Sequence, residues 1–187
     1  MSRQQIVAGA ADMIRRRGLN ATSIREVAKH AGTPLGSTYH YFPGGKSQLA
    51  TEAVQWASDT VQKVLAAKLR KGPIAGLQAF FALWRQIVTD TDFQAGCPVL
   101  AVAIEEIADP QAVAAAAEAF RAWSELLENA LKDHGVQAPR AKSLAQLVVA
   151  AAEGAVAMCR AQRGTQPLDD VAKELTALLE SVIEART

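Results

Sequence analysis

Apolar residues recur along most of this chain at the three- and four-residue spacing of amphipathic helices, and runs of alternating β-branched residues are absent. Glycine and proline separate the helical stretches, as at Gly18, Gly72-Pro73, Asp109-Pro110 and Gly135. The pattern predicts an all-α protein with about nine helices. We expect them at residues 3–17, as two short helices within 22–42, and then at 46–71, 74–90, 98–107, 110–133, 139–163 and 167–185.

The two short helices carry clear start and stop signals. Ser23 is followed three residues later by Glu26, the capping-box pattern in which each side chain satisfies a backbone N–H at the start of a helix. Gly32 tolerates the positive φ of a sharp turn, Thr33 is a good N-cap, and Pro34 suits the first position of a helix. These signals predict two helices joined by a tight turn.

The second short helix is polar where a core helix would be apolar. Residues 35–42, LGSTYHYF, carry hydroxyls, an imidazole and a small glycine instead of a broad apolar stripe. This composition is typical of a helix that lies in the major groove of DNA. The pair therefore predicts a helix-turn-helix, with Phe42 as a buried plug against the first helix and Tyr41 either buried or exposed.

Charge is distributed unevenly along the chain. Residues 1–50 hold seven Lys and Arg against two acidic residues, a net charge of +5, whereas the remainder holds thirteen against seventeen, a net charge of −4. A basic N-terminal part on an acidic body favours a polyanionic partner for the N-terminal part alone.

The helix-turn-helix also resembles a known family signature. The positions that carry the resemblance are Ile24, Val27, Ala28, Ala31, Gly32, the run Gly36-Ser37-Thr38-Tyr39-His40-Tyr41-Phe42, and Lys46. Over its first 50 or so residues the chain resembles the TetR family of bacterial transcriptional regulators. The resemblance implies a three-helix DNA-binding domain at residues 1–48 and a helical effector-binding and dimerisation domain at residues 49–187.

The linker after the second helix departs from the common family form. Phe42-Pro43-Gly44-Gly45-Lys46 is one residue longer than usual. Together with Gly96-Cys97-Pro98, this linker resembles a subgroup of TetR-like repressors related to flavonoid- and lincosamide-responsive regulators.

Roles on DNA follow from residue type and from the resemblance. We expect Arg25, Lys46 and the helix start at Thr22-Ser23 to hold phosphates, which fixes register without reading sequence. The resemblance implies that Tyr39 and His40 contact phosphate and base edges, while Gly36 permits close approach. The remaining expected DNA-binding residues are Thr33, Ser37 and Leu35, the last by contact with a thymine methyl group.

The larger aromatic residues outside this motif all lie between residues 56 and 123. They either pack as core or line an apolar cavity for a small ligand. The resemblance raises the second alternative, because this region houses the effector pocket in the family. The pocket candidates are Trp84, Cys97, Trp123 and Met158.

The helix expected at 139–163 is apolar on both sides apart from Glu153, so one side must meet something other than its own core. The helix at 167–185 has a matching apolar stripe, which predicts a two-fold symmetric four-helix interface between two copies. The expected interface residues are Val149, Glu153, Val156, Leu175, Leu179 and Val182. Glu153 pairs across this interface, points into the pocket, or is a partly solvated rim carboxylate.

Other classes of function find no support in the sequence. The motifs of metalloproteases, serine hydrolases and nucleotide-binding enzymes are absent, as is any His, Cys and carboxylate cluster with metal-ligand spacing. Cys97 and Cys159 are far apart in the sequence and suit buried thiols. No uninterrupted apolar stretch of about 18 residues predicts a membrane span. We therefore expect a protein without cofactor, metal or enzymatic activity, located in the cytoplasm.

Together these features predict a ligand-responsive transcriptional repressor. It would bind a palindromic double-stranded operator as a homodimer and be released by a small hydrophobic, aromatic effector. The alternatives are a DNA-binding regulator without an effector and a helical module that contacts another protein.

Overall fold

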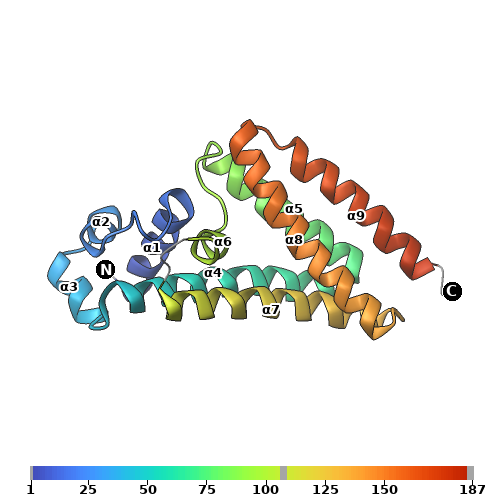
Figure 1. The fold of residues 1–187 in the computed structure, drawn as a ribbon, viewed down its shortest axis with the longest axis horizontal. Coiled ribbons are helices and arrows are strands. Elements are labelled where there is room, and N and C mark those ends of the chain that lie inside the picture. Colours follow the sequence, from blue (N-terminus) through green and yellow to red (C-terminus); the bar gives the residue numbers. More distant parts are fainter. Residues whose placement is uncertain (1, 106–108, 185–187) are drawn as a thin grey trace. The chain divides into compact units, whose positions relative to one another are not determined.

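The computed structural model describes residues 2–105 and 109–184, which form nine α-helices and no β-strand (Figure 1). The all-α prediction is confirmed. The helices are α1 (Arg3–Arg17), α2 (Ile24–His30), α3 (Leu35–Tyr41), α4 (Gly45–Leu69), α5 (Pro73–Asp90), α6 (Pro98–Ala103), α7 (Pro110–Asp133), α8 (Ala138–Gln162) and α9 (Gln166–Glu184). The largest difference from the expected bounds is in α6, which ends at Ala103; residues 106–108 of the expected helix lie outside the described residues.

The chain divides into two compact units. The first, which we call the head unit, contains Met1–Asp59 and Cys97–Ala119, and the second, the body unit, contains Thr60–Gly96 and Phe120–Thr187. The long helices α4 and α7 each contribute one end to each unit. The domain boundary expected after residue 48 stays a prediction.

The head unit is built around the apolar face of α1. Ile6, Ala10, Met13 and Ile14 are buried there, and α2, α3 and α6 all pack against this helix. Phe42, directly after α3, is fully buried as expected, and the Arg3 guanidinium lies 5.1 Å from the centre of its ring. Burial of a phenylalanine contributes about 1.5–3 kcal/mol, so this side chain fixes the end of α3 against the unit.

In the body unit, α5, α8 and α9 contact one another pairwise (Figure 1). Its core holds an edge-to-face aromatic cluster in which the rings of Phe80, Trp84 and Trp123 are each 6.1 Å apart. Trp84 and Trp123 are at most 1% exposed. Such pairs add about 0.5–1.5 kcal/mol beyond the burial of their area.

Helix α8 is the one described helix that is long and apolar enough to span a membrane by length and composition. Half of the relevant stretch is buried inside the structure. Core helices of soluble proteins have this character too, so the feature is weak support for a membrane span.

Candidate nucleic-acid interface

The start of α2 and the turn after it form as the sequence predicted, whereas the start of α3 differs from the prediction. Ser23 caps α2: its Oγ accepts the Glu26 N–H at 3.2 Å, and the Ser23 N–H donates to the Glu26 carboxylate at 3.1 Å. Gly32 has φ of +65°, the left-handed conformation that glycine adopts without strain. The capping box and the turn glycine are therefore both present.

Thr33 does not cap α3, which corrects one expectation. The N-cap position is Pro34, and α3 begins at Leu35. Thr33 is instead 8% exposed, with its hydroxyl directed to the Ala28 carbonyl at 3.3 Å. Because this hydroxyl bonds inside the turn, we expect no direct contact between Thr33 and DNA.

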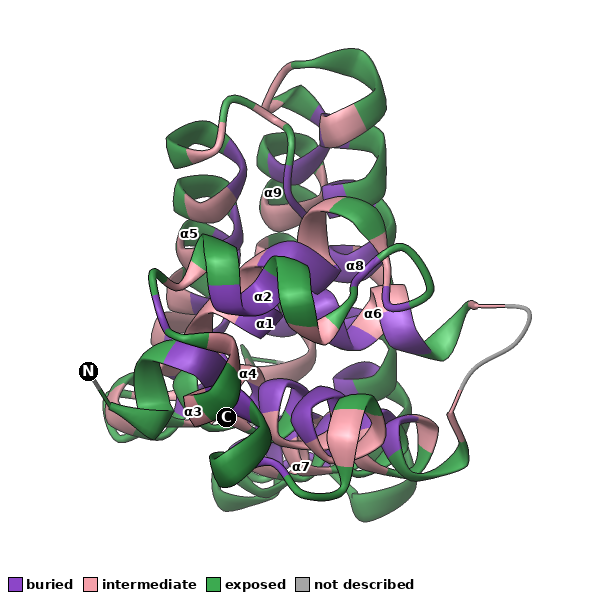
Figure 2. Cartoon of the chain, turned by 90° about the vertical axis from the view of Figure 1, so that its left-hand side faces the viewer, coloured by how far each residue is buried: buried purple, intermediate pink, exposed green. Residues whose placement is uncertain are grey.

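Most of α3 faces solvent, as Figure 2 shows by its largely exposed surface. Tyr39 is 54% exposed, and Gly36 and His40 are also exposed. A Cβ built on Gly36 would meet no atom within 4 Å, so this side of the helix is open. Leu35 and Ser37 are half-buried. Tyr41, whose placement the sequence left open, is 37% exposed.

An open cleft of about 410 Å³ lies beside α3 in the head unit. It brings together five of the residues expected to bind DNA, which come from three segments of the chain: Thr22, Ser23, Arg25, Tyr39 and Lys46. The lining also includes Asn20, Ala21, Ile24 and Glu26. Arg25 and Lys46 supply positive charge, while Tyr39 supplies a phenol.

Two members of this cleft are already engaged in the structure. Thr22 is 4% exposed, and its hydroxyl donates to the Gly18 carbonyl at 2.7 Å. The Ser23 hydroxyl donates to the Glu26 carboxylate at 2.8 Å. Hydrogen bonds from the Ser23 side chain and backbone hold the pKa of Glu26 below its ordinary value, so Glu26 remains a carboxylate near neutral pH. Arg25 and Lys46 are therefore the two positively charged side chains in the lining of this cleft.

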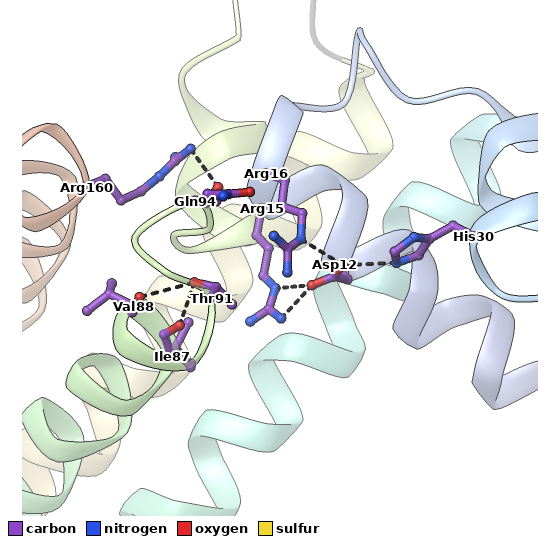
Figure 3. Close-up of polar contacts among 9 residues, drawn as sticks. All are labelled: Asp12, Arg15, Arg16, His30, Ile87, Val88, Thr91, Gln94 and Arg160. Atoms are coloured by element: carbon purple, nitrogen blue, oxygen red, sulfur yellow. Dashed lines mark hydrogen bonds and ion pairs between the residues drawn. The ribbon is translucent and has the colours of Figure 1, made fainter. Parts of the chain in front are cut away.

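Asp12 of α1 links this helix to α2 (Figure 3). It accepts hydrogen bonds from Arg15 Nε at 2.8 Å and Arg16 Nε at 2.9 Å, and His30 Nε2 of α2 lies 3.0 Å from its Oδ2. Burial raises the pKa of Asp12, but the hydrogen bonds from Arg16 and Arg15 outweigh burial and leave the pKa below its ordinary value. Asp12 is therefore a charged carboxylate near neutral pH, and it holds α2 through its contact with His30.

The turn before α2 depends on residues that sequence reasoning missed. The Asn20 N–H is shared between the two carboxylate oxygens of Glu105, at 2.9 and 3.1 Å, and the Asn20 carbonyl accepts from Lys46 Nζ at 3.3 Å. Glu105 follows α6 and is 85 residues away from Asn20 in the sequence. No local pattern links positions so far apart, so only the folded chain reveals the contact.

The predicted pocket residues do not lie together in one unit. Trp84 and Trp123 belong to the aromatic core of the body unit. Cys97 belongs to the head unit, where its Sγ accepts the Leu100 N–H at 3.4 Å and caps α6. Met158 is 49% exposed on α8. Their role in ligand binding stays a prediction.

The residues expected at a dimer interface occupy the inner side of the body unit. Val149, Glu153 and Val156 are at most 5% exposed within the single chain, and Leu175 and Leu179 are also buried. Only Val182 is half-buried. The structure thus corrects which side of α8 is turned outward: the exposed side carries Leu147 and Met158 together with Ala150, Gly154 and Ala157.

A buried three-helix head with an exposed polar third helix is the arrangement of helix-turn-helix DNA-binding regulators. Comparison with protein families agrees. Residues 6–53 match the family of bacterial regulatory proteins named tetR, and residues 73–174 match the C-terminal domain of LmrA/YxaF-like transcriptional regulators. The chain belongs to the TetR family of bacterial transcriptional regulators, which confirms the resemblance seen in the sequence.

Individual relatives support the same assignment over the full chain. A helix-turn-helix transcriptional regulator of Mycobacterium tuberculosis is 38% identical over 99% of this chain and 97% of its own length. The regulator LmrA of Bacillus subtilis is 29% identical over 96% of this chain and 97% of its own length. These relatives are transcriptional regulators, which confirms the prediction that the protein is not an enzyme.

Solved structures confirm the fold. A TetR regulator from Legionella pneumophila matches with a TM-score of 0.83 at 21% identity, covering 95% of this chain and 97% of that one. A regulatory protein from Rhodobacter sphaeroides matches with a TM-score of 0.84 at 18% identity, covering 93% and 96%. These structures show the TetR fold, and the family matches show that the protein is a DNA-binding transcriptional regulator.

Proposed function

We propose that this protein is a dimeric, ligand-responsive repressor that acts in the cytoplasm on a palindromic operator. The observation that carries the proposal is the exposed polar face of α3 beside the cleft that contains Arg25, Tyr39 and Lys46. In a dimer, two copies of α3 would enter major grooves about 34–36 Å apart or somewhat more.

Phosphate contacts and base contacts would come from different residues. Arg25 and Lys46 would bind phosphates and set the register of the head on the duplex. Tyr39 and His40 would contact phosphate and base edges from the exposed side of α3, and Gly36 would let the helix approach closely. Leu35 and Ser37, which are half-buried, would add short contacts such as one with a thymine methyl.

The second copy would pack on the outward side of α8. Leu147 is 45% exposed and Met158 is 49% exposed, and the positions between them on this side are Ala or Gly. A Cβ built on Gly154 would meet no atom within 4 Å. Small residues between two large apolar ones allow close helix approach, and Val182 of α9 would extend the contact.

An effector is supported by the interior of the body unit. The indole N–H of Trp84 is buried, and no hydrogen-bond acceptor for it is present among the described residues. A buried donor without an acceptor costs about 1–3 kcal/mol. A ligand with an acceptor oxygen beside Trp84 would satisfy this N–H, and an aromatic ligand would suit the neighbouring rings of Phe80 and Trp123. Release from DNA requires that such a ligand bind the DNA-incompetent conformation more tightly.

The proposal is tested by fluorescence anisotropy of the purified protein with the DNA upstream of its own gene. Binding should saturate, exceed binding to scrambled DNA, and weaken steeply as salt rises. Tyr39→Ala should weaken operator binding at least about tenfold, equivalent to about 1.4 kcal/mol, without lowering the melting temperature. Equal affinity for operator and scrambled DNA would contradict the proposal for this operator region.

The phosphate role has its own matched pair of variants. Lys46→Ala should weaken binding. It should also reduce the slope of log affinity against log salt by about 1, the amount that one phosphate contact contributes. Lys63→Ala removes the same charge from an exposed position of the body unit and should change neither quantity. Identical slopes for the two variants would exclude Lys46 from the phosphate contacts.

The effector is tested by a screen of aromatic compounds for two joint effects, a higher melting temperature and release of the operator. Trp84→Phe keeps an aromatic ring but removes the N–H together with the second ring of the indole, so it should weaken an active compound severalfold. If no compound produces either effect, the protein is a DNA-binding regulator without a small-molecule effector.

A further inference from the structure

The turn that precedes α2 is held from outside the DNA-binding motif. Gly18 ends α1 with φ of +83°, and Leu19 to Thr22 then lead into α2. Asn20 is the first residue of this turn to line the cleft beside α3. The position of Asn20 therefore affects the wall of the proposed phosphate site.

Glu105 contacts this turn at two residues, Asn20 and Gly18. Both of its carboxylate oxygens lie within 3.1 Å of the Asn20 nitrogen, so the N–H is held whichever way it tilts. Glu105 also packs directly on Gly18: a Cβ built there would lie 2.3 Å from Glu105 Oε1. A glycine is thus required at residue 18 both for its φ and for the approach of this carboxylate.

The carbonyl of Asn20 contacts a residue that is expected to bind DNA. This carbonyl accepts from the Lys46 ammonium at 3.3 Å, and Lys46 lines the same cleft as Arg25 and Tyr39. One peptide segment thus joins Glu105 to the lysine expected to bind a phosphate. A carboxylate in a DNA-binding unit repels the phosphates of DNA. The hydrogen bonds to Asn20 give Glu105 a structural role that explains its presence here.

Glu105 also occupies a special place along the chain. It lies within residues 73–174, which match the C-terminal family domain, yet it belongs to the head unit with α1–α3. Its link to Asn20 therefore joins a segment of the C-terminal family domain to the DNA-binding turn.

We propose that Glu105 is a positioning residue for DNA binding, which holds the Gly18–Thr22 turn so that Asn20 presents Lys46 to the operator phosphates. The inference rests on the proposed DNA-binding role of the head unit. It goes beyond that role because it assigns part of the control of the DNA surface to a residue that touches no DNA.

The sign of the effect on affinity separates positioning from simple charge repulsion. Glu105→Ala should weaken operator binding three- to tenfold and reduce the salt slope by about one contact, because Lys46 loses its fixed place. Charge repulsion alone predicts the reverse, a tighter complex when the carboxylate is removed. Glu105→Gln keeps an acceptor oxygen and should stay within about twofold of wild type. Glu125→Ala removes an exposed carboxylate of the body unit as the charge-matched control and should have no effect.

Hydrogen exchange of the free protein tests the contact without DNA. The Asn20 amide should exchange at least threefold faster in Glu105→Ala than in wild type, while the amides inside α5 keep their protection. Unchanged exchange at Asn20 would overturn the inference, as would tighter or unchanged operator binding by Glu105→Ala. If wild type fails to bind any operator but the exchange result holds, the DNA-binding proposal fails and the Glu105 contact stands. Loss of protection in α5 as well would identify a general unfolding effect and overturn the positioning role.

Discussion

Asp12→Asn is the perturbation whose outcome follows most directly from the geometry. Oδ1 of Asp12 accepts from Arg15, whereas Oδ2 accepts from Arg16 and faces His30 Nε2 at 3.0 Å. Asparagine offers one carbonyl oxygen, so it can serve only one of these two groups of donors. The other group would face an NH2, and the negative charge is lost as well.

The magnitude can be bracketed from exposure. A hydrogen bond to a charged group contributes about 1.5–3 kcal/mol, while an exposed ion pair contributes about 0.2–1 kcal/mol. The Asp12 side chain is 18% exposed, and those of Arg15 and Arg16 are 25% and 31% exposed, so intermediate values apply. We expect a loss of about 2 kcal/mol, which corresponds to a melting temperature about 4–8 °C lower for a chain of this size.

Thermal and urea unfolding of wild type and Asp12→Asn measure this loss. Asp59→Asn is the matched control, because Asp59 is exposed and its replacement should leave both midpoints unchanged. A loss below about 0.5 kcal/mol for Asp12→Asn would refute the reasoning, because surface substitutions without structural partners already fall in that range.

The pH dependence gives a second test of the same site. The folded-state pKa of Asp12 lies below its ordinary value, so its stabilising effect is present above the unfolded-state pKa and is lost as pH falls through the folded-state pKa. The difference between wild type and Asp12→Asn should therefore be full at pH 7 and shrink below about pH 4. A difference that grows on acidification would contradict this sign.

Three further outcomes follow from burial. Thr33→Val should cost about 1 kcal/mol of stability, by urea unfolding, and leave operator affinity within twofold, because the Thr33 hydroxyl bonds to Ala28 inside the turn; a large loss of DNA affinity would return Thr33 to the interface. Leu147→Asp should yield a monomer in sedimentation analysis, and a dimer of unchanged affinity would place the second copy elsewhere. Burial raises the pKa of the fully buried Cys159 thiol, so its alkylation at pH 8 should be at least about tenfold slower than in unfolded protein, and equal rates would show that the thiol is accessible.

Local signals were sufficient for the helices and for the DNA-binding motif. The helix α1 begins and ends where the sequence predicted, and the capping box of Ser23 and Glu26 forms with both of its hydrogen bonds. These features depend on residues three or four apart, whose interactions are set by helix geometry alone. The same locality explains why the turn at Gly32 was predictable.

The sequence-based predictions were wrong where a side chain could point either into the protein or toward solvent. Thr33 is a residue type that often caps helices, yet its hydroxyl bonds to the Ala28 carbonyl inside the turn. Helix α8 is apolar on both sides, and the pattern could not tell which side packs on α5 and α9. Val149 and Val156 proved to be buried within the single chain, while Leu147 and Met158 are exposed.

The sequence by itself determined that this protein is helical, that it contains a helix-turn-helix with a polar second helix, and that the chain belongs with the TetR regulators. The tertiary structure alone decided which face of each helix is outward and that Glu105 meets Asn20. The physical reason is the range of the interactions: capping, turns and periodicity act within a few residues, whereas packing and the Glu105 contact join residues whose distance along the chain carries no local signal.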